Sequence, residues 1–402
     1  MKVLHVIPSL SPKHGGPSFC VPMIIESQLQ VGMQVDIVTT DDDGPGCRTT
    51  VPLGQRIERN GYGIFYFSKQ TEFYKISLPL NRWLARHITD YDIVCIHVVF
   101  SFSTTSAAWH ARRQRVDYIV VPHGVLNRWG MKNRRPFLKM LSSRLVESSI
   151  LRDAAAMYYT SGAERREAEQ SGATARAVII PHGINVAEYQ NLPDPEIFLK
   201  RFPQARGKKL VLFLSRLDAK KGLNLLLDSW AENRKSEIGN RKLEGWLLVI
   251  GGSGEEDYVR GLRDRAAQLK LDEDIIWTGF LSGVDKLSAF AAATIFILPS
   301  YSENFGIALI EAMAAGLPCL TTPGVALAED VQARAADVLM VVPPETKPLA
   351  VALEQLQRNP ALREQLGANA KRMATEQFTP SSMGISLKKL YEEILVSRTS
   401  RS

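Results

Sequence analysis

Two glutamates, Glu303 and Glu311, carry the clearest chemical pattern in this sequence. They lie within residues 298–318, where an apolar, strand-like run ends at Pro299 and a helix is predicted to begin near Gly306. Along a helix that rises about 1.5 Å per residue, the two carboxylates are on the order of 10 Å apart. That separation is too large for an acid and a base acting on one bond. It suits two contacts on an extended ligand, such as a sugar and a ribose flanking a diphosphate.

The predicted start of this helix, near Phe305 and Gly306, is itself a candidate anion site. The first N–H groups of a helix are unpaired and favour negative charge, and small residues there let a diphosphate approach closely. A second interpretation stays open. In it, Glu303 is only a favourable acid at the helix N-terminus and Glu311 pairs locally.

Two cations, Arg216 and Lys221, follow another strand-like run and precede a predicted helix. Both would project at the carboxyl edge of the strand, where a diphosphate needs its charge neutralised. Arginine offers a bidentate fork there and lysine a point charge. Asp218 could instead be the partner of either cation, because basic loops between a strand and a helix are also common surface turns.

Gly15 and Gly16 occupy a third loop of this kind, after the first strand-like run. Adjacent glycines let backbone N–H groups come near a ligand oxygen. The loop has neither the GxGxxG pattern nor the GK[ST] sequence of a triphosphate-binding loop. A flexible turn with Pro17 at the helix start remains the alternative.

The elements that position these residues alternate between strand and helix along the chain. Short Val- and Ile-rich runs indicate strands buried on both faces, and the alternation predicts parallel sheets covered by helices. We expect an α/β chain with an N-terminal domain over 1–190, a linker over 191–208 and a C-terminal domain over 209–378. Ligands of such sheets bind beyond the carboxyl ends of the strands, so two facing domains would place the candidate residues around one cleft.

A last helix is predicted over residues 382–396. Leu387, Leu390 and Ile394 fall on one stripe of it at helical spacing. In a two-domain protein, this tail (residues 379–402) could pack back on the N-terminal domain.

The 402 residues, 45% hydrophobic and 23% charged, have a globular composition, which excludes collagen-like, low-complexity and wholly disordered chains. No apolar run approaches the roughly 18 residues that span a bilayer, and the N-terminus lacks the cleavage site of a signal peptide. Four cysteines without CxxC spacing argue against a disulfide framework or a zinc site and fit a reducing cytosol. We therefore expect a cytoplasmic protein.

The net charge of +7 owes much to residues 112–144, which hold nine basic residues and one acid, Asp117. This basic window suits an anionic membrane surface, a phosphate-bearing ligand or nucleic acid, and a solvated helix face is the alternative. Trp129, Phe137, Met140 and Leu141 among the charges favour a membrane surface and a lipid acceptor. The near-neutral second half of the chain argues against nucleic acid. The basic residues are Arg112, Arg113, Arg115, Arg128, Lys132, Arg134, Arg135, Lys139 and Arg144.

Three motifs taken together resemble glycosyltransferase family 4. They are the glycine pair at 15–16, the Ser-Arg-Leu-(x)3-Lys-Gly stretch at 215–222 and the Glu-(x)7-Glu pattern at 303–311. The resemblance covers nearly the whole chain. It implies the GT-B fold, two Rossmann-like domains facing an interdomain cleft. It also implies transfer of a sugar from a nucleotide diphosphate donor with retention at the anomeric carbon, with no metal or other cofactor required.

By this resemblance, Arg216 and Lys221 hold the donor diphosphate and stabilise the departing charge, and Glu303 lies beside the transferred sugar. Glu311 takes the ribose hydroxyls. The other donor contacts that it implies are Gly15 and Gly16 at the phosphate, Asn304, Phe305 and Gly306 through the backbone, and Gly279 and Phe280 at the base.

His123, in the Val-Pro-His-Gly stretch at 121–124, resembles the family's cleft histidine near the sugar and joins the candidate catalytic residues. A satisfied core histidine is the alternative for His123. His97, at the end of its own predicted strand, could instead be the cleft residue, and the same alternative holds for it.

Asp41, Asp42 and Asp43 form a triplet after a predicted strand. A DxD triplet binds a divalent metal in the other large glycosyltransferase fold. Here the triplet leads into Gly44, Pro45 and Gly46, so we expect a solvated turn and no metal.

The function implied is a retaining hexosyltransferase that uses a UDP- or GDP-sugar and a glycan or lipid-linked acceptor. Its setting would be bacterial exopolysaccharide or lipid-linked glycan synthesis, at the inner face of the plasma membrane. Two other classes stay open: a nucleotide-sugar epimerase of the same fold and a non-catalytic nucleotide-sugar-binding protein. The sugar, base and acceptor depend on pocket shape, which single residues do not reveal.

Overall fold

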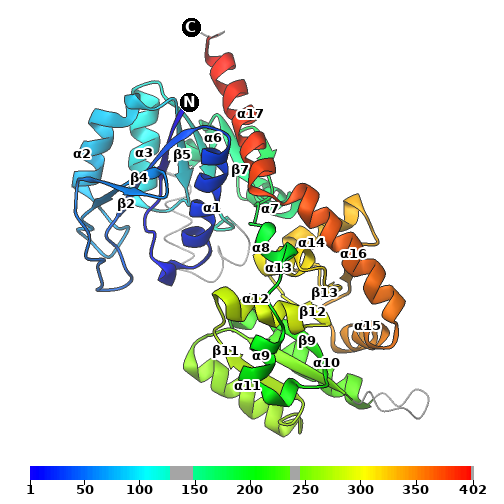
Figure 1. Cartoon of the computed structure of the whole chain (residues 1–402). Helices are drawn as coiled ribbons and strands as arrows, with labels where there is room; N and C mark the ends of the chain where they lie inside the picture. The colour runs from blue at the N-terminus through cyan, green and yellow to red at the C-terminus, as the bar shows by residue number, and fades with distance from the viewer. Residues whose placement is uncertain (127–147, 236–244, 400–402) are drawn as a thin grey trace. The chain divides into compact units, whose positions relative to one another are not determined.

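The computed structural model describes residues 1–126, 148–235 and 245–399. It divides into two compact units, the N-unit (Met1–Gly183 with Pro380–Ser402) and the C-unit (Ile184–Thr379), as Figure 1 shows. Each unit is built on a mainly parallel sheet with helices packed on it. The predicted alternation of strand and helix is confirmed in both units.

Residues 191–208, predicted as a linker, belong to the C-unit. They contain α9 (Glu196–Arg201), where Phe198 is buried, and the 3-10 helix η4 (Pro203–Ala205). Two prolines stand at the starts of these short helices: Pro195 is the N-cap of α9 and Pro203 is the first residue of η4. The fixed φ of proline suits the start of a helix. The N-unit accordingly ends at Gly183 rather than at residue 190.

The described part of the N-unit has eight strands in the order β3-β4-β2-β1-β5-β6-β7-β8, parallel except where β3 meets β4. The β3–β4 hairpin turns at Asn60 and Gly61, which have φ of 49° and 86°. Asn-Gly is a strong signal for a type I′ turn, and our sequence interpretation overlooked it. The strands are β1 (Lys2–Val6), β2 (Gln34–Thr40), β3 (Arg56–Arg59), β4 (Tyr62–Phe67), β5 (Ile93–His97), β6 (Asp117–Val121), β7 (Ala156–Tyr159) and β8 (Ala177–Ile179).

Helices cover both faces of this sheet, and the apolar side chains divide into two core clusters. Along β1, Leu4 and Val6 belong to one cluster and Val3 to the other, as expected for a strand buried on both faces. None of the described helices is long and apolar enough to cross a bilayer. The N-unit helices are η1 (Pro12–His14), α1 (Gly16–Gln30), α2 (Leu78–His87), η2 (Ile88–Asp90), α3 (Phe102–Arg113), α6 (Ser148–Arg152), α7 (Gly162–Gln170) and α17 (Pro380–Thr399).

The C-terminal helix α17, red in Figure 1, packs along α1 within the N-unit. The predicted stripe of Leu387, Leu390 and Ile394 is buried in the same core cluster as Ile24 of α1. Burying one such side chain contributes about 1.5–3 kcal/mol. The tail is therefore a structural part of the N-unit core.

The described part of the C-unit has six parallel strands in the order β11-β10-β9-β12-β13-β14. Parallel pairing puts all their carboxyl ends at one edge, where the loops carry the predicted donor-binding residues. The strands are β9 (Lys209–Leu214), β10 (Trp246–Gly251), β11 (Ile275–Gly279), β12 (Ile295–Leu298), β13 (Cys319–Thr321) and β14 (Met340–Val341). The remaining helices are α8 (Ala187–Gln190), η5 (Ala219–Lys221), α10 (Leu223–Lys235), α11 (Glu256–Gln268), α12 (Gly283–Ala292), α13 (Ile307–Ala314), α14 (Ala326–Arg334), α15 (Thr346–Arg358) and α16 (Pro360–Gln377).

Candidate active site

Two loops at the carboxyl edge of the C-unit sheet are in close contact. Gly222 follows η5 with φ +71°, and a Cβ there would lie 2.0 Å from the carbonyl oxygen of Pro299. The Tyr301 N–H donates to the carbonyl of Lys220 at 2.7 Å. Only glycine fits this approach, which joins the loop after β9 to the loop after β12.

This contact brings together two motifs that lie far apart in the sequence. The Lys221 ammonium group forms an ion pair with the Glu303 carboxylate, and the two side chains are 6% and 18% exposed. The Glu303 N–H donates to the Gly324 carbonyl at 2.8 Å, and the Glu303 carbonyl accepts from the Ala326 N–H at 3.0 Å. Glu303 is therefore held against a cation of another loop. In the described structure, no side chain caps the start of α13.

Lys221 is a buried cation with other positive charges close by. Burial lowers the pKa of Lys221 to about 7, Lys220 and Arg216 add to the effect, and Asp218 opposes it. The Glu303 carboxylate also favours the charged form. Arg216 is exposed, and Asp218 accepts the Lys220 N–H at 3.0 Å as the cap of η5. An arriving anion would stabilise the charge on Lys221.

Helix α13 begins close to its predicted start. Gly306 is its N-cap with φ +97°, and a Cβ there would lie 2.8 Å from Cγ1 of Val325. Phe305 is buried and Asn304 is half-buried, so the peptide groups leading into α13 are tightly packed. In the first turn of α13, the Leu309 N–H donates to the Gly306 carbonyl at 2.9 Å, so the predicted anion site would use the N–H groups that precede Leu309.

Glu311 forms its contacts outside its own helix. Its Oε1 accepts a hydrogen bond from Nζ of Lys286 on α12 at 2.8 Å, and the Tyr189 hydroxyl on α8 also donates to it. The alternative of local pairing along α13 is therefore wrong. The carboxylate keeps 14% exposure, and a carboxylate can accept further hydrogen bonds.

A pocket of about 410 Å³ lies beyond the carboxyl ends of β10 and β11. Gly279 and Trp277 line it, and the Arg263 guanidinium carbon lies 5.4 Å from the centre of the Trp277 ring. Phe280 is 70% exposed and is not among the lining residues. Our sequence interpretation missed the lining loop at 252–254, although its Gly-Ser-Gly sequence between a strand and a helix was a usable signal.

In the N-unit, Gly15 and Gly16 join η1 to α1. Gly15 has φ +81°, and Gly16 is the first residue of α1. A Cβ on Gly16 would have no described neighbour within 4 Å. Packing within the described structure does not require a glycine at this position. The absence of a side chain there would instead let a ligand approach the backbone closely.

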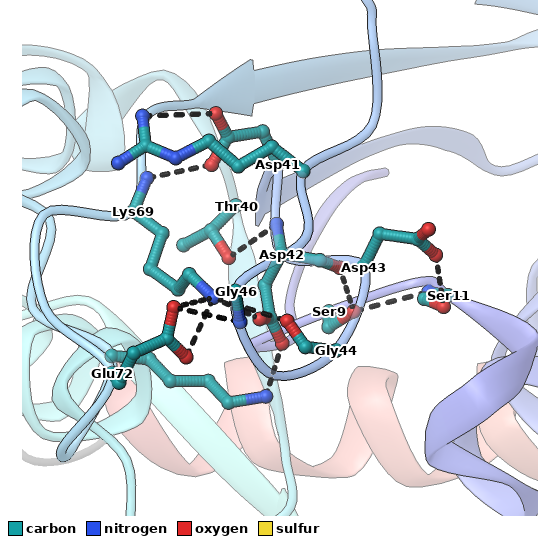
Figure 2. A network of polar contacts seen from close by, with 12 residues as sticks. Ser9, Ser11, Thr40, Asp41, Asp42, Asp43, Gly44, Gly46, Lys69 and Glu72 are labelled. Carbon is teal, nitrogen blue, oxygen red and sulfur yellow. Dashed lines mark hydrogen bonds and ion pairs between the residues drawn. The ribbon is translucent and has the colours of Figure 1, made fainter.

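Asp41 and Asp42 of the aspartate triplet are buried and Asp43 is half-buried, which corrects the prediction of a solvated turn. Asp42 is 1% exposed and accepts from Nζ of Lys69 at 2.7 Å (Figure 2). It also pairs with Lys75 and His14. Asp41, also buried, accepts the Lys69 N–H at 2.7 Å. A buried carboxylate is tolerated when nearby cations neutralise its charge. Here the cations lie outside the turn in the sequence, at Lys69 and Lys75.

This network also fixes the glycine loop. The Ser11 hydroxyl donates to Asp43 at 2.6 Å, and the Ser9 hydroxyl donates to the Asp42 carbonyl at 2.7 Å (Figure 2). The Lys13 ammonium group also donates to Asp43, at 2.8 Å. These residues precede Gly15, so the triplet positions the loop that opens α1.

The two candidate histidines are hydrogen-bonded to each other. His97 is fully buried, and its Nδ1 lies 2.9 Å from Nε2 of His123. Nε2 of His97 lies 2.7 Å from Nδ1 of His5. His97 is thus a core histidine. His123 is partly exposed and has φ +54° at the end of β6.

Only the first part of the basic window is described. Arg112, Arg113 and Arg115 at the end of α3 are exposed, and Arg112 pairs with Asp153 at 2.8 Å. The other basic residues of the window, and the apolar residues Trp129, Phe137, Met140 and Leu141, lie outside the described residues. The predicted membrane surface stays a prediction.

Comparison with known families covers both units. Residues 196–373 match the family described as glycosyl transferases group 1, and residues 15–183 match the glycosyl transferase 4-like domain. The chain is 32% identical to the phosphatidyl-myo-inositol mannosyltransferase of Mycobacterium leprae over 337 residues, 79% of this chain and 77% of that protein. It is 27% identical to the alpha-monoglucosyldiacylglycerol synthase of Streptococcus pneumoniae over 269 residues, 64% of this chain. The chain spans about half (52%) of the length of that relative.

Solved structures identify the fold. The structure of HepE from Anabaena with UDP and glucose matches 98% of this chain and 100% of its own, with a TM-score of 0.73 and 18% identity. The sucrose-phosphate synthase of Thermosynechococcus elongatus matches 99% of this chain and 100% of its own, with a TM-score of 0.75 and 19% identity. The chain therefore belongs to glycosyltransferase family 4, among the glycosyl transferases group 1, and has the GT-B fold.

Proposed function

We propose that this chain transfers a hexose from a UDP- or GDP-sugar to a hydroxyl of a glycan or lipid-linked acceptor, with retention of the anomeric configuration and without a bound metal. The observation that carries the proposal is the ion pair between Lys221 and Glu303. It sets a cation suited to a diphosphate beside a carboxylate suited to sugar hydroxyls, at the strand edge where such folds bind ligands.

The departing diphosphate gains negative charge as the bond to the sugar breaks. Lys221 and Arg216 are preorganised cations that stabilise this charge, assisted by N–H groups of Gly16 and of the first turn of α13. The carboxylates of Asp41 and Asp42 are already compensated by protein cations. Catalysis is therefore assigned to side chains and backbone dipoles, with His123 and Glu303 at the sugar.

The nucleoside has its own candidate contacts in the C-unit. The pocket lined by Trp277, Gly279 and Arg263 is large enough for a base, and Glu311 has acceptor capacity left for the ribose hydroxyls. HepE, whose fold this chain shares, is described as a complex with UDP and glucose, which supports a nucleotide-sugar donor.

A lipid-linked acceptor is supported by two relatives whose names denote glycolipid synthesis, the diacylglycerol glucosyltransferase and the phosphatidylinositol mannosyltransferase. The basic window at 112–144 supports contact with an anionic surface. We propose that the protein works peripherally at the cytoplasmic face of the plasma membrane, in exopolysaccharide or lipid-linked glycan synthesis.

The test starts with a thermal-shift screen of UDP-, GDP- and ADP-sugars, since a ligand of the native state raises the melting temperature. The donor identified is then incubated with lipid and glycan acceptors, and the anomeric proton coupling of the product is read by NMR. A product that keeps the donor's anomeric configuration supports the proposal. A new nucleotide sugar formed from donor alone would identify an epimerase instead, and binding without any conversion would identify a non-catalytic binder.

A further inference from the structure

A continuous hydrogen-bonded chain runs through the N-unit core and ends at His123. The amide nitrogen of Gln28 donates to the Tyr391 hydroxyl at 2.9 Å, and the Gln28 carbonyl lies 2.8 Å from Nε2 of His5. Nδ1 of His5 lies 2.7 Å from Nε2 of His97, and Nδ1 of His97 lies 2.9 Å from Nε2 of His123. His5 and His97 are fully buried and His123 is partly exposed, so the chain leads from the core to the surface.

The direction of every hydrogen bond in this chain follows from its buried end. Tyr391 also bonds to the thiol of Cys95, and because a thiol is a weak donor, the hydroxyl donates there and accepts from Gln28. The Gln28 carbonyl can only accept, so His5 carries its proton on Nε2. A neutral imidazole has one donor and one acceptor nitrogen, so each following ring also carries its proton on Nε2.

Burial keeps these rings neutral, because an imidazolium loses its hydration in the core. Burial lowers the pKa of His5 to about 4 and that of His123 to about 3, and it lowers the pKa of His97 well below its usual range. Cys20 and His182, whose side chains lie close to His123, are neutral as well. Burial raises the pKa of the Cys20 thiol on α1 to about 12 and lowers that of His182, which stacks on His123, to about 4.

The backbone at His123 is fixed from the opposite side by a buried carboxylate on α7. Oε1 of Glu164 accepts the Gly124 N–H at 2.7 Å, and Oε2 accepts the N–H and the hydroxyl of Thr160 at 2.8 and 2.7 Å. These hydrogen bonds stabilise the carboxylate where it is. They hold the left-handed turn at His123 and Gly124 in one orientation.

We propose that this hydrogen-bonded chain fixes His123 as the neutral Nε2–H tautomer, so that its Nδ1 lone pair accepts a hydrogen bond from a sugar hydroxyl, and that Gln28 is the positioning residue that sets this direction. The inference rests on the proposed function, since it assigns the atom with which His123 meets the sugar. A hydroxyl can donate to Nδ1. The carboxylate of a uronic acid can only accept hydrogen bonds, so it would meet the Nδ1 lone pair of His123 with no proton between the two acceptors. The subsite at His123 therefore favours a neutral hexose over a uronic acid at the position it contacts.

Substituting Gln28→Glu reverses the chain, because a carboxylate beside His5 favours its imidazolium. One proton from solvent binds Nδ1 of His123. The Nε2 proton of His123 then passes to Nδ1 of His97, and the Nε2 proton of His97 passes to Nδ1 of His5. His5 ends with both protons, and His123 ends as the neutral Nδ1–H tautomer, a donor instead of an acceptor.

The experiment uses the full chain labelled with ¹⁵N-histidine, and long-range ¹H–¹⁵N NMR identifies the protonated nitrogen of each ring. We expect His123 of the unsubstituted protein to show the Nε2–H pattern, unchanged from pH 5 to 8. An Nδ1–H pattern or an imidazolium for His123 in that range would overturn the proposal. Gln28→Glu should convert His123 to Nδ1–H. Gln30→Glu, which adds the same charge at an exposed position of the same helix, should leave it unchanged.

Binding of UDP-glucose and UDP-glucuronate by calorimetry tests the consequence for the substrate. In Gln28→Glu, we expect the Kd of UDP-glucuronate relative to that of UDP-glucose to fall on the order of tenfold. In Gln30→Glu, this ratio should stay constant. An unmoved ratio with a converted tautomer would overturn the assignment of Nδ1 to the sugar. The NMR reading needs no donor, so if no nucleotide sugar bound at all, the proposed function would fail while an Nε2–H pattern still supported the tautomer.

Discussion

The Lys221 ammonium group and the Glu303 carboxylate compensate each other where two loops of the C-unit sheet edge touch. A cation that is nearly buried needs such a partner, because an unpaired charge in the core is costly. The same cation is the strongest candidate for the donor diphosphate. The ion pair therefore links the stability of this contact between two loops to the affinity of Lys221 for an anion.

Replacing Lys221 by alanine should lower kcat by about 10²–10³-fold, the usual loss when one preorganised group that stabilises the leaving charge is removed. Steady-state kinetics with the identified donor measures this loss. Lys220→Ala, at the adjacent and less buried position, is the matched control and should change kcat far less. Equal effects of the two substitutions would show that only the general positive charge of the loop matters.

Replacing Glu303 by glutamine should make donor binding more sensitive to alkaline pH. Burial lowers the pKa of Lys221 to about 7, and the Glu303 carboxylate favours its charged form, so the substitution lowers this pKa further. Affinity for UDP should then fall at a lower pH than in the unsubstituted protein as pH rises. Calorimetry between pH 6 and 9 measures the midpoint, and Glu345→Gln, on an exposed residue, should leave it in place.

Substitutions at Gly16 and Gly222 should separate ligand binding from folding. A side chain on Gly16 meets no described atom within 4 Å, so Gly16→Val should keep the melting temperature nearly constant and weaken donor binding at least tenfold. Gly222→Ala places a Cβ 2.0 Å from the Pro299 carbonyl at positive φ, and should cost at least about 1–3 kcal/mol of stability. Thermal unfolding and UDP titration of both variants check this. A strongly destabilised Gly16→Val would contradict a role in binding.

Replacing Asp42 by asparagine should destabilise the N-unit by about 3–5 kcal/mol at pH 7, because the buried Lys69 loses its buried counter-charge and keeps the exposed carboxylate of Glu72. Burial raises the pKa of Asp42, but the hydrogen bonds from Lys69 and Lys75 more than offset this and hold it below its usual value. The contribution is complete above the unfolded-state pKa of about 4 and is lost as pH falls through the folded-state pKa. Urea unfolding should therefore show a gap between the two proteins that shrinks below pH 4.

Asp43→Asn is the control for this prediction. Asp43 is 30% exposed and pairs with Lys13, which is 60% exposed, so its loss should leave the stability nearly unchanged. If both substitutions had the same small effect, the network around Asp42 would not stabilise the loop before Gly15.

Neutralising Arg134, Arg135 and Lys139 together should weaken binding to anionic vesicles by about 100-fold, since each basic residue near such a surface contributes about 1 kcal/mol. Vesicle sedimentation at low and high salt measures this, and binding should weaken as salt rises. Lys388→Ala with Lys389→Ala, two exposed positions on α17, serves as a comparison. Undiminished binding by the triple variant would exclude the basic window as a membrane contact.

The sequence predicted the alternation of strands and helices, apart from the β3–β4 hairpin, α2 and α9, and it predicted the loops that carry Arg216, Lys221 and Glu303. These signals are local, because each motif follows an apolar strand and precedes a helix. Parallel pairing then brings the strand ends to one edge without further information. The tail helix was also predictable, since its apolar stripe repeats at helical spacing.

The buried aspartate triplet and the histidine chain were not predictable in the same way. The partners of Asp42 come from positions 14, 69 and 75, and a local reading of Asp-Asp-Asp-Gly favours a turn in water. The link from His5 to His97 depends on the register of β1 against β5, where His5 lies opposite Cys95. Such contacts require tertiary structure. The prediction of a linker over residues 191–208 was wrong for a local reason. Prolines that can end one element can also begin a helix, as they do at α9 and η4.

The position of α17 has a consequence for biosynthesis. The ribosome completes the whole C-unit before it produces Pro380–Thr399, yet the N-unit needs this helix to cover Ile24 and to supply the hydroxyl that Gln28 contacts. The N-terminal part of the N-unit (Met1–Gly183) is therefore synthesised first, and the apolar face that α17 covers stays exposed until the end of translation. A chaperone that shields nascent apolar surface would act on this protein during that interval.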